Sequence, residues 1–143
     1  MQKNTEHFTI TKSEQPDKKY IDEQIHNFNK AHVPYLNEEI IFLNYVIKEG
    51  NTTIAGINSL LYCWKIAYVD ILFVEESHRH QGLGKKLLTK VENEAKQQGA
   101  TLIHLETFDF QAKDFYLTMG FEIFGILDDC PPGHKRYYLK KVI

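Results

Sequence analysis

A polar loop that contains two glycines stands between an apolar segment and an amphipathic segment. The loop is Arg79-His80-Gln81-Gly82-Leu83-Gly84, and Lys85 follows it. Gly82 and Gly84 have no Cβ, so the oxygens of a ligand could approach the main chain closely. A helix that begins here would present free N–H groups and the positive end of its dipole. With the charges of Arg79 and Lys85, this combination predicts a phosphate or pyrophosphate site.

Other phosphate-binding loops fit this segment less well. A Walker loop needs glycine five residues before Gly84 and Ser or Thr after the lysine, but the chain has Arg79 and Lys86 there. A dinucleotide-binding fingerprint needs a small third residue, and Leu87 is too large for that close helix–strand contact. A glycine-rich turn that merely connects a strand to a helix stays open as the structural alternative.

Two motifs together resemble the GCN5-related N-acetyltransferase (GNAT) family. Val74-x-x-x-x-Arg79-x-x-Gly82-x-Gly84 is similar to the family loop whose backbone amides bind the pyrophosphate of acetyl-CoA. Downstream, the segment from Ala112 to Phe121 resembles the family's Ala-x-x-Phe-Tyr-x-x-x-Gly-Phe. The resemblance covers roughly Ile41 to Lys141, and the residues before Ile41 match in general layout alone.

The resemblance implies a fold, a co-substrate and its contacts. The expected fold is α/β: a mixed, mostly antiparallel sheet with a central parallel pair that splays apart and helices on both faces. Acetyl-CoA is the expected co-substrate, with no metal, and its pantetheine arm would pair with the open edge of the first splayed strand. The expected cofactor-binding residues are Leu72, Phe73, Val74, Arg79, His80, Gln81, Gly82, Leu83, Gly84, Lys85 and Asp109.

Two residues depart from the family pattern. Glu76 stands where the family often has proline, which affects only the exit of the strand. Asp109 stands where the family often has asparagine, so it lacks the side-chain amide that can bond the pantetheine arm.

Acetyl transfer to an amine needs both a base and an acid. An alkylamine has a pKa near 10.4 and is mostly protonated at neutral pH, so a carboxylate or a water relay must remove a proton. Tyr116 occupies the family position of the acid that protonates the departing thiolate; packing in the core is its structural alternative. Asp70 and Glu106 are the candidate bases, with a structural hydrogen bond as the rival role. Asp70 is narrowly favoured because a charge inside an apolar strand is costly, and alternation places it on the face of Leu72 and Val74.

The pattern of residues predicts the following elements in chain order. Strands are expected at Phe8–Thr11, Ile40–Lys48, Thr52–Tyr62, Ile66–Val74, Thr101–Thr107, Phe121–Leu127 and Arg136–Lys141. Three helices are expected: one that begins at Pro16 and ends before Val33-Pro34, one at Leu83–Gln98 and one at Gln111–Thr118. The strands at Ile66–Val74 and Thr101–Thr107 flank one helix and should be parallel. Asp109 should cap the short helix, and Glu92 should face water.

Composition restricts the class of protein. The 143 residues, 43% hydrophobic and 25% charged, are typical of one soluble domain spanning 1–143. A net charge of −2 argues against a nucleic-acid partner, and neither a signal peptide nor a membrane span is expected. Cys63 and Cys130 are expected to be free thiols in a reducing cytoplasm. His78 and His80 have no convincing third ligand for a metal and are expected on a surface loop.

Several questions of function stay open at the level of sequence. The amine acceptor could be a small molecule or a protein, the acyl group could be longer than acetyl, and many members of the resembling family form homodimers. The chain could also be a non-catalytic coenzyme A-binding sensor or interaction module. The retention of Tyr116 and of candidate carboxylates favours an acyl-CoA N-acyltransferase.

Overall fold

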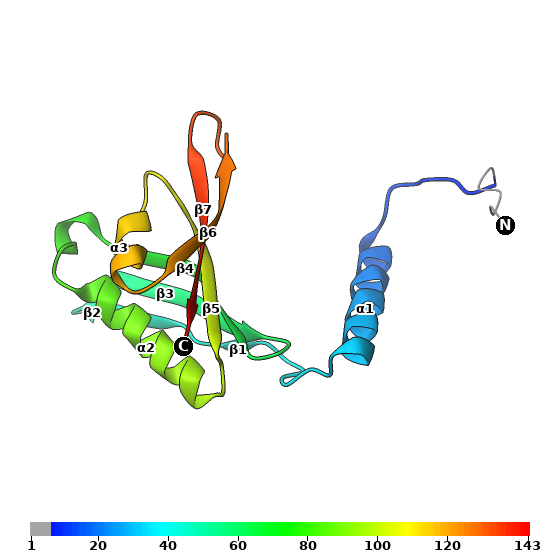
Figure 1. The fold of residues 1–143 in the computed structure, drawn as a ribbon, viewed down its shortest axis with the longest axis horizontal. Helices are drawn as coiled ribbons and strands as arrows, with labels where there is room; N and C mark the ends of the chain where they lie inside the picture. The colour runs from blue at the N-terminus through cyan, green and yellow to red at the C-terminus, as the bar shows by residue number, and fades with distance from the viewer. Residues whose placement is uncertain (1–6) are drawn as a thin grey trace. The chain divides into compact units, whose positions relative to one another are not determined.

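The computed structural model describes residues 7–143, and the chain divides into two compact units, Met1–Tyr35 and Leu36–Ile143. Figure 1 shows the helix of the first unit and the sheet and helices of the second. The single domain expected over 1–143 stays a prediction.

The N-terminal unit contains one helix, α1 (Gln15–His32). Pro16 lies in its first turn, and the Glu14 backbone N–H donates to the Asp17 carboxylate at 2.8 Å, which closes the helix start. The helix ends at His32, before Val33-Pro34, as predicted. Its apolar side chains, which recur at helical spacing, are all exposed: Tyr20, Ile21, Ile25 and Phe28. The strand predicted at Phe8–Thr11 is wrong, because the described residues provide this short segment with no strand to pair with.

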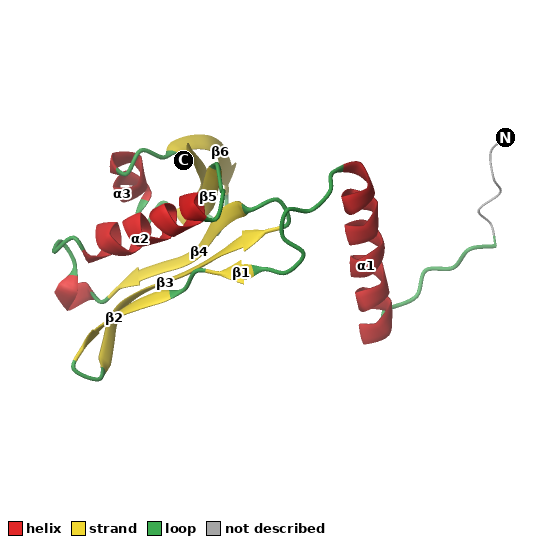
Figure 2. Ribbon diagram, turned by 90° about the horizontal axis from the view of Figure 1, so that it is seen from below, coloured by secondary structure: helices red, strands yellow, loops and turns green. Residues whose placement is uncertain are grey.

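The second unit is built on one seven-stranded sheet. Its strands are β1 (Ile41–Phe42), β2 (Tyr45–Glu49), β3 (Thr52–Tyr62), β4 (Ile66–Val74), β5 (Leu102–Phe108), β6 (Glu122–Asp128) and β7 (Lys135–Val142). The order is β1-β3-β4-β5-β7-β6, with β2 also paired to β3. Only β4 and β5 pair in parallel in the described sheet, so the predicted mixed α/β fold is confirmed. Helices α2 (Leu83–Gln97) and α3 (Lys113–Thr118) and the short 3₁₀ helix η1 (Glu76–His78) complete the unit (Figure 2).

The parallel pair splays apart, as the family resemblance implied. Pairing joins Ala67 to Ile103, Tyr68 to His104, and Val69 to Leu105, and then stops. Beyond Val69, β4 keeps β3 on its other side but has no partner toward β5. The backbone edge of β4 is therefore open over its last residues.

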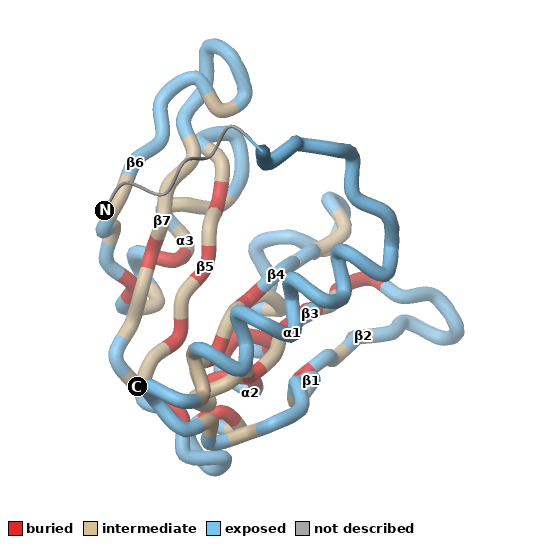
Figure 3. The backbone as a smooth tube through the Cα atoms, turned by 90° about the vertical axis from the view of Figure 1, so that its right-hand side faces the viewer, coloured by how far each residue is buried: buried red, intermediate tan, exposed pale blue. Residues whose placement is uncertain are grey.

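Helix α2 covers one face of this sheet and supplies much of the core. Its predicted apolar face is confirmed, since these side chains are buried: Leu87, Leu88, Val91 and Ala95. Buried residues gather along β3, β4, β5 and α2 (Figure 3). Gly99 follows the helix with a φ of 97°, the left-handed conformation that glycine adopts at little cost.

Glu92 does not face water as predicted. It is 8% exposed and accepts a 2.9 Å hydrogen bond from Lys141 Nζ, because β7 brings that lysine beneath α2. Lys141 also donates to the carbonyl of Met119 at 2.8 Å. A single ammonium group thus connects α2, the end of α3 and β7.

A bulge in β4 overturns the predicted alternation of its side chains. Asn58 pairs with Ile71 and the next residue, Ser59, pairs with Val69, so Asp70 is the extra residue. Ala67 and Val69 are buried before the bulge, whereas Leu72 and Val74 pack on the core after it. Asp70 itself is exposed, which removes the argument that its burial demands a function.

Candidate active site

A cleft of ≈ 800 Å³ lies where β4 and β5 separate, between the loop before α2 and helix α3. Almost all of the residues predicted from the sequence line it: Asp70, Leu72, Phe73, Val74, Arg79, His80, Gly82, Leu83, Gly84, Lys85, Glu106, Asp109 and Tyr116. Gln81 belongs to the same loop but does not line the cleft. The fold therefore brings both sequence motifs to one cavity.

The start of α2 lies at the cleft and has no side-chain cap. Gly82 is the N-cap with a φ of 80°, and no side chain caps the helix. The first bond of the helix runs from the Lys86 N–H to the Gly82 carbonyl, so the preceding N–H groups of the first turn are left for a ligand. A Cβ on Gly82 would meet nothing within 4 Å, which means that the space above the loop is open.

The second glycine has different surroundings from the first. A Cβ on Gly84 would lie 3.5 Å from the Phe115 ring and 3.8 Å from Val74, which are ordinary van der Waals distances. The first turn of α2 therefore lies in contact with α3 and β4 at Gly84, and this packing would accept a Cβ.

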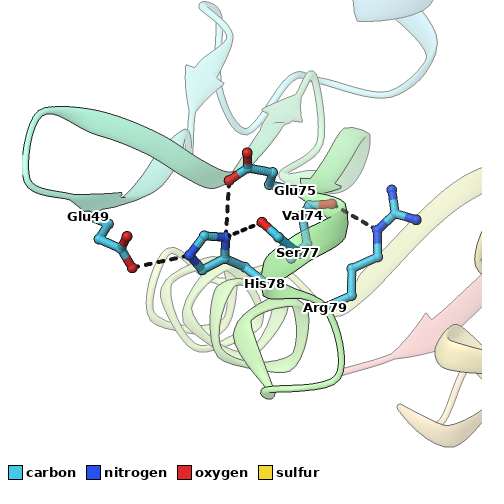
Figure 4. Close-up of polar contacts among 6 residues, drawn as sticks. All are labelled: Glu49, Val74, Glu75, Ser77, His78 and Arg79. Carbon is cyan, nitrogen blue, oxygen red and sulfur yellow. Dashed lines mark hydrogen bonds and ion pairs between the residues drawn. The ribbon is translucent and has the colours of Figure 1, made fainter.

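The loop is braced by side chains at the strand exit (Figure 4). Arg79 donates from Nε to the Val74 carbonyl at 3.0 Å, and its outer guanidinium nitrogens stay at the exposed side. His78 contacts carboxylates on both of its ring nitrogens, Glu49 at 3.1 Å and Glu75 at 3.0 Å. The loop conformation therefore depends on residues that lie outside the glycine motif.

Asp109 does not cap α3 as predicted. The N-cap of α3 is Ala112, and the two oxygens of Asp109 accept from the His134 ring at 2.9 Å and the Lys135 backbone at 3.0 Å. Although burial acts to raise it, these hydrogen bonds hold the pKa of the Asp109 carboxyl below its usual range. Asp109 lines the cleft while it fixes the β6–β7 turn, because the chain reverses beside the end of β5.

Tyr116 lies at the inner side of the cleft on α3 and is 5% exposed. Its ring packs edge-on against Phe121, at 5.7 Å between centroids. Among the described residues, none forms a hydrogen bond with its hydroxyl. Burial raises the pKa of Tyr116 to about 12, so the phenol keeps its proton across the neutral range.

Glu106 and Asp70 both line the cleft but differ in their surroundings. Glu106 accepts a 2.5 Å hydrogen bond from the Tyr68 hydroxyl, and Arg136 Nη2 lies 3.8 Å from the same carboxylate oxygen. Asp70, on the bulge, has no hydrogen bond or ion pair among the described residues. Glu106 is thus held in place, whereas Asp70 is free to meet solvent or a ligand.

Sequence reasoning assigned no role to Tyr68 and His104, which with Tyr62 form a row of rings beside Glu106. The His104 ring centroid lies 5.0 Å from that of Tyr68, and its Nε2 lies 2.8 Å from the Tyr62 hydroxyl. Burial, followed by the hydrogen bond to Glu106, raises the pKa of Tyr68 to about 12, and burial lowers the pKa of His104. The alternation in β5 placed His104 with Glu106, but the tyrosines could be found only from the strand register.

The described residues contain neither a cluster of metal ligands nor a helix that could span a membrane. Between residues 7 and 143, no three His, Cys, Asp or Glu side chains are grouped as metal ligands. None of the helices in that range has the length and apolar character needed to cross a membrane. Both cysteines, Cys63 and Cys130, are free.

Comparison with known proteins gives one family. The model described as "Acetyltransferase (GNAT) family" matches residues 5–121. Blasticidin-S acetyltransferase of Streptomyces morookaense is 35% identical over 79 residues, which are 54% of this chain. The match spans 58% of that enzyme, less than two thirds of its length.

Solved structures share the fold along nearly the whole chain. An acetyltransferase from Bacillus cereus ATCC 14579 has a TM-score of 0.86 and 28% identity, and the match covers 95% of this chain and 98% of the other. An aminoglycoside 6′-N-acetyltransferase complexed with coenzyme A has a TM-score of 0.62 and 16% identity, with 94% and 97% covered. The second similarity is one of fold.

Proposed function

This chain belongs to the Acetyltransferase (GNAT) family, and we propose that it transfers the acetyl group of acetyl-CoA to an amine. The observation that carries the proposal is the cleft itself, in which an uncapped helix start, an open strand edge and a buried tyrosine line one cavity. These three features match the three parts of the donor: the pyrophosphate, the pantetheine arm and the thioester.

Acetyl-CoA would bind with its pyrophosphate over the start of α2. The free N–H groups from Leu83 to Lys85 would donate to the phosphate oxygens, and the helix dipole favours their negative charge. The guanidinium of Arg79 and the loop backbone at His80 and Gln81 lie beside them. The pantetheine amides would pair with the open edge of β4, in the manner of an added strand.

Transfer would then proceed by direct attack of a neutral amine on the thioester carbonyl. The new C–N bond forms, the C–S bond breaks, the nitrogen releases its extra proton to solvent, and the thiolate of coenzyme A takes a proton from Tyr116. Its buried phenol, with a pKa of about 12, holds that proton at neutral pH. Solvent returns a proton to Tyr116 after the product leaves.

Glu106 is the better candidate for the base, and Asp70 the second. The ammonium of the acceptor must lose a proton, directly or through a water, to a carboxylate near the thioester. Tyr68 orients Glu106 and Arg136 limits its movement, so one carboxylate oxygen is left for the acceptor. Asp70 is exposed and without a partner, which suits a contact with a cationic acceptor more than a fixed base.

The acceptor class follows from charge and from the relatives. Two carboxylates at the inner end of the cleft would attract a molecule that carries an ammonium group. The relative from Streptomyces morookaense is named blasticidin-S acetyltransferase, which makes an acceptor of that kind one candidate. A non-catalytic coenzyme A-binding role is the alternative, and it predicts donor binding with no release of free thiol with any amine.

The test of the donor site uses Gly82→Asp with Gly82→Asn as its matched control. Both side chains have the same size and tolerate the left-handed backbone at this position, where a Cβ meets nothing within 4 Å. Only the aspartate adds a negative charge beside the pyrophosphate. We expect Gly82→Asp to bind acetyl-CoA at least ~10-fold more weakly than Gly82→Asn by calorimetry. Equal affinities in the two variants would place the pyrophosphate elsewhere.

A further inference from the structure

We propose that His78, Glu49 and Glu75 form a clasp that holds the pyrophosphate loop in its binding conformation and offsets the negative charge beside it. The proposal rests on the acetyl-CoA site proposed above. His78 is a positioning residue in this role, because it acts through the loop rather than on the reacting atoms.

The clasp connects segments that are distant in sequence. Glu49 ends β2, just before the turn into β3, whereas Glu75 and His78 flank the exit of β4. Glu49 Oε2 lies 3.1 Å from His78 Nε2, and Glu75 Oε2 lies 3.0 Å from His78 Nδ1 (Figure 4). The Ser77 hydroxyl also lies 3.0 Å from Nδ1. Every ring nitrogen therefore has a partner.

The contacts of the His78 ring differ in kind. Nε2 forms a hydrogen bond with the Glu49 carboxylate, and Nδ1 forms one with the Ser77 hydroxyl. The Glu75 carboxylate lies at ion-pair distance from Nδ1. The clasp that we propose is the one in which both ring nitrogens carry a proton, so that one positive charge lies between two negative charges.

The position of the clasp relates it to the donor. His78 lines the same cleft as the loop, and Arg79, the next residue, begins the glycine motif. Without the imidazolium, the carboxylates of Glu49 and Glu75 would add uncompensated negative charge near the proposed phosphate site. Exposed ion pairs contribute little to stability, and here Glu49 is 73% exposed in its side chain. The expected effect is therefore on donor binding, with a small effect on folding.

The backbone shows why the loop needs such support. The N–H of Glu75 donates to the Ile54 carbonyl at 2.8 Å, and the N–H of His78 donates to Glu75 at 2.9 Å. After the 3.3 Å bond from the Arg79 N–H to the Glu76 carbonyl, the next backbone hydrogen bond along this stretch is the 3.0 Å bond from the Lys86 N–H to the Gly82 carbonyl. The conformation of the loop between these two bonds therefore depends on how its two ends are held. The clasp holds the first end against the β2–β3 hairpin.

The experiment compares two acetyl donors in the full-length protein. Acetyl-CoA carries the pyrophosphate, whereas S-acetylpantetheine carries the same thioester and arm without it. For His78→Gln, which keeps a polar side chain but has no charge, we expect the kcat/KM ratio of acetyl-CoA to S-acetylpantetheine to fall by about 10-fold or more, mainly through KM. His78→Arg, a cation with several donors, should recover part of the ratio.

Matched variants separate the clasp from a general loss of structure. Glu49→Gln should lower the ratio less than His78→Gln, and the double variant should lose less than the product of the two single effects. Glu39→Gln, which removes an exposed carboxylate elsewhere, should leave the ratio unchanged. Thermal unfolding of each variant measures any effect on the fold.

Two outcomes would overturn the clasp. If His78→Gln weakens both donors equally, His78 supports the fold in general; if neither donor is affected, the contacts have no role in binding. If the wild-type protein neither binds nor uses acetyl-CoA, the proposed function fails, whatever the variants of His78 do.

Discussion

A single hydroxyl separates the two roles that Tyr116 can have. Its ring packs among Phe115 and Phe121, so the ring would be buried in either case. Tyr116→Phe keeps the ring and removes only the proton donor. We expect turnover to fall about 10²-fold or more while acetyl-CoA affinity is retained. Steady-state kinetics measures the turnover, and calorimetry measures the affinity for acetyl-CoA. The control is Tyr137→Phe, because Tyr137 also lines the cleft. Unchanged turnover in Tyr116→Phe would mean that Tyr116 only packs in the core.

The two carboxylates can be separated in the same way. Glu106→Gln keeps the shape of the side chain and its acceptor for the Tyr68 hydroxyl but cannot take up a proton. We expect kcat to fall about 10²-fold or more and the ascending limb of the pH–rate profile to flatten. Asp70→Asn should raise the KM of a cationic acceptor and leave that limb in place. If Asp70→Asn removes the limb instead, the assignment of the two residues is reversed.

The sequence was sufficient to place the glycine loop at the start of a helix and insufficient to predict the partners of side chains. Glycines at Gly82 and Gly84 identify a loop that a ligand or a neighbouring helix can approach, whatever surrounds them. The partners of Glu106 were not predictable, because Tyr68 reaches it across strands in a register that includes a bulge. The bulge also explains why Asp70 was favoured as a buried base although it is exposed.

At the scale of elements, local signals predicted several boundaries but not the details of packing. The single strand predicted at Ile40–Lys48 is wrong, because the chain forms two strands there, β1 and β2. The prediction of Ile66–Val74 coincides with β4, and α2 ends within one residue of the prediction. Apolar runs, glycine and proline determine such limits within the chain itself. The burial of Glu92 depends on Lys141, which lies 49 residues away in sequence, so helical periodicity could not predict it.

The connection made by Lys141 should matter for stability. Lys141→Met would leave the Glu92 carboxylate buried without its partner, with Oε1 already unbonded. We expect the free energy of unfolding to fall by about 3 kcal/mol in urea titrations. Lys140→Met is the control, since Lys140 meets Glu122 at 3.8 Å on the surface and should cost less than about 1 kcal/mol. If both variants lose the same free energy of unfolding, the buried pair contributes no more to stability than the surface pair.

At the scale of the whole molecule, the donor site belongs to one of the two units. The described core begins at Leu43, and the residues that line the cleft run from Val69 to Tyr137. We expect a chain of residues 36–143 to fold and to bind acetyl-CoA with the affinity of the full-length protein, measured by calorimetry. A folded fragment without affinity would mean that the first unit completes the donor site.

The separation of β4 from β5 places unpaired backbone groups inside a sheet instead of at its rim. At an outer edge, such groups attract strands of other molecules and lead to aggregation. Here β3 lies on one side of β4 and the paired start of β5 limits the other, so a foreign strand with side chains on both faces has little room to enter. A thin, unbranched chain that carries its own amides can still be admitted. The gap therefore offers the pairing capacity of an edge strand to a small ligand while it withholds that capacity from other proteins.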